Sequence, residues 1–172
     1  MDTASKHEID FYRWTQEQAA ALRLAPPDLL ALDFDNLAEE IEDMGRNEAN
    51  AISSLLKQTL AHLLKIAIDS NAQAVNHWYE EATTFQGDAV LSFSPGLKQK
   101  LDLDMIWRVA RNGATRSLQV HNVVIPPLPD TCPLSLDDLI DPDFDPREAV
   151  SSISSAIKDV HRNAASHDRR KQ

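Results

Sequence analysis

Residues 51–68, AISSLLKQTLAHLLKIAI, decide what kind of fold this chain can form. The apolar side chains of this stretch recur at helical spacing and cover a broad arc of the helix; they are Ile52, Leu55, Leu56, Leu60, Leu63, Ile66 and Ala67. Such a wide apolar face is typical of a helix that other elements surround. We therefore expect a bundle of helices built around this segment, with Leu60 and Leu63 deeply buried.

The length and charge of the chain limit its class and its partners. At 172 residues it suits one domain, since domains usually have roughly 100–200 residues. It has 17 basic and 27 acidic residues, which gives a net charge of −10. A surface of that sign repels phosphate backbones and anionic lipid headgroups, so we expect neither nucleic acid nor a membrane as partner.

The single cysteine and the N-terminal sequence bear on the cell compartment. Cys132 alone allows no internal disulfide and no cysteine-based zinc site, and it has no cationic neighbour in sequence that would activate its thiol. The N-terminus, MDTASKHEIDFY, carries acids where a signal peptide has an apolar run. The longest apolar stretch, 60–68, is far shorter than the ~20 residues of a membrane span. We expect a cytoplasmic protein.

Helix signals precede residues 51–68. A first helix is expected to follow an Asp10 N-cap and to end before Pro26 and Pro27. A second should open near Asp33 or Asp35. Its apolar stripe is expected to consist of Leu37, Ile41 and Met44. Gly45 should then kink or interrupt the helix, because glycine costs about 1 kcal/mol relative to alanine inside a helix.

The second half of the chain carries further helix signals. We expect a fourth helix over about 74–93, a fifth from a Ser94 N-cap to about residue 119, a short helix capped by Ser135, and a last one from Asp145 and Pro146 to about residue 165. Residues 120–128 have β-branched character but no partner strand, so they are predicted to be an extended connector.

These signals predict an all-α, single-domain bundle of six or seven helices. Residues 1–7 are expected to be a flexible or disordered N-terminus, 8–146 the helical domain, and 147–172 a C-terminal amphipathic helical extension with a frayed tail. Within the extension, apolar residues recur at steps of three and four, as in a coiled-coil seam; they are Val150, Ile153, Ile157, Val160 and Ala164. This interaction stripe should dock within the chain or on a second copy, so monomer and homodimer both remain open.

Catalytic candidates come from one acidic cluster and one histidine. The candidates are Glu39, Glu40, Asp43 and His62. Glu40 borders the apolar stripe, so it is expected to be partly buried, which would raise its pKa. His62 borders the wide apolar arc and could pair with Glu40 across two packed helices as a general base. The alternative is a solvated helix face and a hydrogen-bonded core histidine. Because Gly-rich phosphate loops and H-E-x-x-H are absent, we expect no cofactor and no metal.

Several segments resemble one bacterial family. They are Asp10-Phe-Tyr-x-Trp14, Asn36-Leu-Ala-Glu-Glu-Ile-Glu-Asp-Met-Gly45, His62-Leu-Leu-Lys65, Ser94-Pro-x-Leu97, Leu128-Pro-Asp-Thr-Cys-Pro133 and Leu136-x-x-Leu139. In order and spacing they are similar to the "domain of unknown function 29" family, over about residues 8–146. The resemblance implies a small all-helical protein, of a kind common in cyanobacteria and proteobacteria, with no established activity. One departure is Asn76-His-Trp-Tyr-Glu-Glu81, acidic where the family usually has a basic Ser-Trp-Arg element.

Two functions are compatible with these observations. The first is a non-catalytic, acidic helical module that binds another protein, such as an adaptor or an antitoxin-like protein with a basic partner. The second is a small hydrolase or metal-dependent enzyme that uses Glu40 and His62. Convergence of these side chains in one cleft would favour the enzyme, and their dispersal would favour the module.

Overall fold

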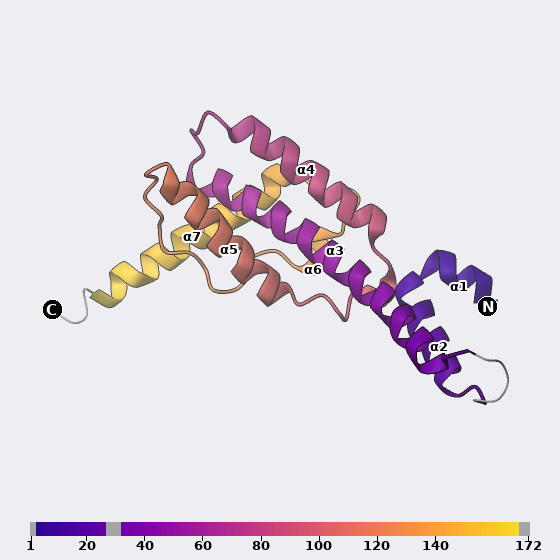
Figure 1. Ribbon diagram of the computed structural model, residues 1–172. Helices are drawn as coiled ribbons and strands as arrows, with labels where there is room; N and C mark the ends of the chain where they lie inside the picture. The colour runs from indigo at the N-terminus through magenta and orange to yellow at the C-terminus, as the bar shows by residue number, and fades with distance from the viewer. Residues whose placement is uncertain (1–2, 27–31, 169–172) are drawn as a thin grey trace. The chain divides into compact units, whose positions relative to one another are not determined.

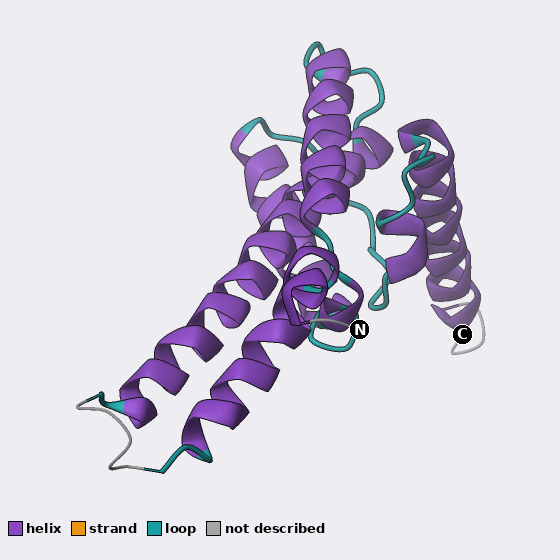
Figure 2. Cartoon of the chain, turned by 90° about the vertical axis from the view of Figure 1, so that its right-hand side faces the viewer, coloured by secondary structure: helices purple, strands orange, loops and turns teal. Residues whose placement is uncertain are grey.

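The computed structural model describes residues 3–26 and 32–168, with side chains described for 6–26 and 32–163. In this part of the chain all regular structure is helical, and there is no strand (Figure 2). The elements are α1 (Thr3–Ile9), α2 (Phe11–Arg23), α3 (Phe34–Ile68), α4 (Val75–Ser92), the 3₁₀ turn η1 (Pro95–Leu97), α5 (Leu103–Val120), α6 (Leu136–Leu139) and α7 (Pro146–Asp168). The predicted all-α class is confirmed.

The chain forms two compact units. The first comprises Met1–Ser53 and Ser92–Leu101, and the second comprises Ser54–Leu91 and Asp102–Gln172. Part of the segment expected to be flexible, 1–7, belongs to helix α1. The predicted division at 8–146 and 147–172 remains a prediction.

In the first unit, α2 lies alongside the first half of α3 (Figures 1 and 2). The predicted start of α2 is confirmed, because the Asp10 side chain accepts a hydrogen bond from the backbone N–H of Arg13 at 3.1 Å. Ala19 on α2 and Ala38 on α3 are fully buried. At the end of α2, Arg23 forms an ion pair with Glu42 of α3.

Helix α3 is continuous over 35 residues, so the break that was one of two expectations at Gly45 does not occur. A Cβ atom at Gly45 would lie 3.2 Å from Cδ2 of Tyr12 and still closer to Oγ1 of Thr15. The missing side chain therefore lets α2 pack closely on α3. This tertiary contact offsets the low helix propensity of glycine, which is the only ground on which a break was expected.

In the second unit, the second half of α3 carries the core. Leu56, Leu60, Leu63 and Leu64 are fully buried, so the predicted burial of Leu60 and Leu63 is confirmed. Trp107 of α5 is also fully buried, and its indole N–H donates to the carbonyl of Pro129 at 3.0 Å. This bond satisfies the one polar group of the ring and holds the loop that follows α5.

The fifth helix begins later than expected. The Ser94 side chain makes no capping hydrogen bond, and only the short turn η1 follows it. Helix α5 starts after Asp102, whose side chain accepts from the backbone N–H of Met105 at 2.9 Å. The Ser135 cap of α6 is confirmed as a reciprocal capping box with Asp138. Residues 123–129 form a connector without regular secondary structure, while the predicted connector at 120–128 began too early, because Val120 still belongs to α5 and residues 121–122 form a turn.

The apolar stripe of α7 faces the protein. Ile153 and Ile157 are buried within the chain, and Val150 and Val160 are half-buried. The side chain of Ala164 lies outside the described residues. The two central isoleucines are therefore covered without a second copy.

We predict that Leu63→Ala lowers the free energy of unfolding by about 2–5 kcal/mol, as truncation of a fully buried leucine does. Urea unfolding measures the change. Leu91→Ala is the matched control, because Leu91 is 86% exposed. An unchanged denaturation midpoint for Leu63→Ala would contradict the core described above.

We also predict that Gly45→Ala destabilises the protein, although alanine is the better helix former, because the added methyl group collides with Thr15 and Tyr12. In a Thr15→Ala background the cost should shrink, since the closest colliding atom is gone. A double-mutant cycle measures this coupling. If the two substitutions are additive, the proposed close contact does not limit the packing of α2.

Candidate functional site

The acidic cluster of α3 is not a buried site. Glu39 and Glu40 are exposed, and Asp43 forms an ion pair with Arg46 one turn later. The expectation that Glu40 is partly buried is therefore wrong. Glu40 has no hydrogen-bond or ion-pair partner among the side chains that the structure describes.

Glu40 is exposed because of the way α3 is oriented about its own axis. Its inward line in the first unit is Ala38, Gly45 and Ile52, which are seven residues apart and buried. The expected inward stripe lies at the edge of this face: Leu37 is 40% exposed and Met44 is 50% exposed. Small residues at positions 38 and 45 let α2 approach there, and this spacing is the sequence signal that could have identified the inward face.

His62 does not contact Glu40. Both lie on α3, roughly six helical turns apart. The partner of His62 is Glu81 of α4, at 3.0 Å between Nε2 and Oε2. Glu81 also lies 3.5 Å from Nε2 of His77, one turn earlier on α4. The predicted pairing of His62 with Glu40 is therefore wrong, and the acid that contacts His62 comes from the segment that departs from the family pattern.

The two members of this pair differ in burial, because the side chain of His62 is 13% exposed and that of Glu81 is 35% exposed. Burial and the nearby Lys65 lower the pKa of His62, while Glu81 opposes the shift. Lys65 lies 5.7 Å from the ring centre of Trp78, and burial lowers its pKa as well. The Nδ1 atom of His62 is buried and has no hydrogen-bond partner in the described structure. An imidazole whose second nitrogen is covered cannot take a proton from a substrate without a movement that uncovers it.

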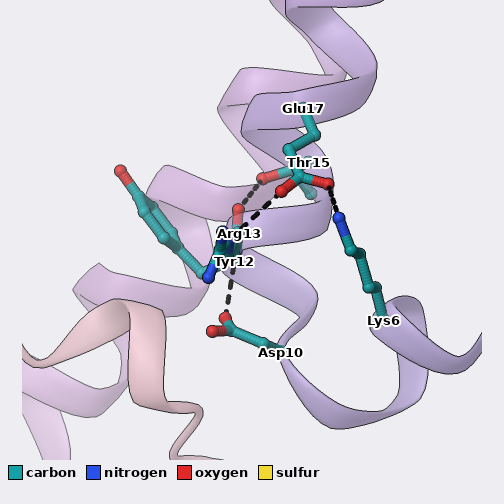
Figure 3. Close-up of polar contacts among 6 residues, drawn as sticks. All are labelled: Lys6, Asp10, Tyr12, Arg13, Thr15 and Glu17. Carbon is teal, nitrogen blue, oxygen red and sulfur yellow. Dashed lines mark hydrogen bonds and ion pairs between the residues drawn. The ribbon is translucent and has the colours of Figure 1, made fainter. Parts of the chain in front are cut away.

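A polar network organises the start of α2 (Figure 3). Glu17 accepts from Nζ of Lys6 at 2.7 Å and from Nε of Arg13 at 3.1 Å, and these bonds lower the pKa of its carboxyl. A Cβ at Gly96 would lie 2.6 Å from Oδ1 of Asp10, so η1 packs directly on this cap. A groove of about 570 Å³ runs beside α2 here, lined by both charge signs. Its charges are mostly engaged with each other.

Glu48 is a carboxylate that no sequence motif singles out. It lies one turn after Met44 on α3, and its Oε2 atom is buried with no hydrogen-bond donor among the described residues. Burial and the negative charge of Asp10 raise the pKa of its carboxyl. A buried acceptor left unsatisfied costs about 1–3 kcal/mol, so this position calls for an explanation.

Cys132 is the single cysteine of the chain. Burial raises the pKa of the Cys132 thiol to about 11, so the thiol stays protonated at neutral pH. Across 3–26 and 32–168, no group of three or more His, Cys, Asp or Glu residues is placed to hold a metal ion. None of the described helices combines the length and the apolar character needed to cross a membrane.

The fold and these segments place the chain in a class of small helical proteins without assigned activity. Residues 7–145 match the family model "Domain of unknown function DUF29", and the chain belongs to this family. A crystal structure of an alpha-helical protein of unknown function from Rhodospirillum rubrum is similar, with 32% identity and a TM-score of 0.80. The match covers 84% of this chain and 95% of that one. No curated protein matches.

We predict that His62 makes the folded state less stable in acid. Its folded-state pKa is lowered from 6.5, so the unfolded chain binds a proton more readily. The stabilisation is complete above about pH 6.5 and is lost as the pH falls toward the lowered folded-state pKa. Urea unfolding at a series of pH values should therefore show a shallower acid slope for His62→Gln. Equal slopes for variant and wild type would contradict this assignment.

Proposed function

We propose that this protein is a non-catalytic helical module that binds another protein, as an adaptor or an antitoxin-like protein does. The observation that carries the proposal is the exposure of large apolar side chains on α3, at Leu37 and Met44. Leucine and methionine exposed on one side of a helix, here two turns apart, are typical of surfaces that bind partner helices. Such side chains gain free energy only when a second surface covers them.

The alternative is an enzyme that uses Glu40 and His62. Glu40 is exposed and without a described partner, while His62 is engaged with Glu81. A general base and its assisting acid must meet within hydrogen-bond distance of a substrate. The separation of these two residues therefore favours the interaction module.

We predict that the full-length tagged protein, cross-linked in the cells that produce it, enriches a specific partner protein over an untagged control. Mass spectrometry of the cross-linked peptides identifies the partner and the surface that it contacts. Leu37→Ser combined with Met44→Ser should lose most of the enrichment, and Leu91→Ser should keep it. If no protein is enriched above the untagged control, the proposed function is wrong.

A further inference from the structure

The exposed edge of α3 forms a continuous line of side chains. We call it the α3 edge; it consists of Leu37, Ile41, Met44 and Glu48. These positions follow the spacing i, i+4, i+7 and i+11, so they lie on one side of the helix. Leu37 and Met44 are exposed, Ile41 is half-buried, and the Oε2 atom of Glu48 is buried without a hydrogen-bond donor in the described structure.

Helix α2 leaves Leu37 and Met44 of this edge exposed. The Arg23–Glu42 ion pair marks the opposite side of the α2–α3 contact. Glu42 lies four residues after the buried Ala38, and Ile41 lies three residues after it. Glu42 and Ile41 therefore lie on opposite sides of the inward line of α3. By the same rule, the half-buried Leu22 of α2, three residues after Ala19, borders the α3 edge.

The charge around the edge has one sign. Residues 33–45 contain six acids and no Lys, Arg or His. Two of these acids are neutralised, Glu42 by Arg23 and Asp43 by Arg46. Glu40 lies beside the edge, between Leu37 and Met44 in sequence, and it is exposed. A second copy of this chain would place acid against acid here. Since like charges that face each other oppose association, the edge is not suited to a second copy.

We propose that the α3 edge is the docking surface for a basic amphipathic helix of a partner protein. This inference rests on the proposed function and names its surface and the chemistry of its partner. The apolar stripe of the partner covers Leu37, Ile41 and Met44, as ridges pack into grooves between two helices. A lysine or arginine at the end of that stripe lies beside the half-buried Glu48, and flanking cations face Glu40.

Substitution of Glu48 should affect the stability of the free protein and the affinity for the partner differently. Its carboxyl is buried near another negative charge, so ionised Glu48 adds little to the stability of the free protein. A cation of the partner beside the half-buried Glu48 would offset the repulsion from Asp10, so the ionised carboxylate would be more favourable in the complex than in the free protein. Glu48→Gln should therefore leave the thermal midpoint unchanged or raise it, while it weakens the complex. A purely structural glutamate would behave in the opposite way.

The test uses a synthetic peptide and the full-length protein. The fluorescent peptide is an amphipathic helix of about five turns, with leucines at i, i+4 and i+7 and lysines at i+11 and along both flanks. A second peptide has the same composition in scrambled order. Fluorescence anisotropy should show saturable binding of the patterned peptide that weakens with salt, and binding of the scrambled peptide at least about tenfold weaker.

Four variants locate the binding surface. Leu37→Ser with Met44→Ser, and separately Glu48→Gln, should each weaken binding by about tenfold. Leu91→Ser and Asp88→Asn are matched controls on exposed positions of the second unit, and they should change binding less than about twofold. Thermal unfolding of each variant shows that the fold is kept.

Three results would overturn the inference: no saturable binding, equal binding of both peptides, or wild-type affinity in the α3-edge variants. Cross-links in cells that map a partner to the second unit would also overturn it, while the proposed function would stand. If no partner protein is enriched, the proposed function itself is contradicted.

Discussion

The close approach of α2 to α3 at Gly45 is the constraint on which the first unit depends. Because no side chain is present at this position, Tyr12 and Thr15 pack directly against the backbone of α3. The contact fixes the rotation of α3, so that Ala38 and Ile52 face inward with the glycine. Leu37 and Met44 are turned to the edge as a consequence, and the unsatisfied carboxyl of Glu48 lies on the same side of the helix.

The sequence alone predicts the features that depend on local chemistry or on a wide apolar pattern. The Asp10 and Ser135 caps, the burial of Leu60 and Leu63, and the all-α class are of this kind. The continuous helix through Gly45 was not predictable from propensity, because a tertiary contact overrides it. The pairing of His62 with Glu81 could not be predicted from the sequence either, since it depends on which residues of α4 face α3.

The charged groups of this protein differ in what they contact. Asp43, an acid that the sequence offered for chemistry, forms an ion pair with Arg46, and the candidate His62 contacts Glu81. Glu40 and Glu48 differ, because neither has a partner that satisfies it among the described side chains. Both flank the exposed Leu37 and Met44. A surface with apolar centre and acidic borders is complementary to a basic helix.

Nuclear magnetic resonance of the full-length protein during titration with the patterned basic peptide tests the central claim most directly. The account predicts that the amide signals of residues 37–48 and of Leu22 shift most, while signals of the second unit, including His62 and Glu81, move little. Shifts centred on α4 or α5, or spread evenly over the acidic surface, would contradict it.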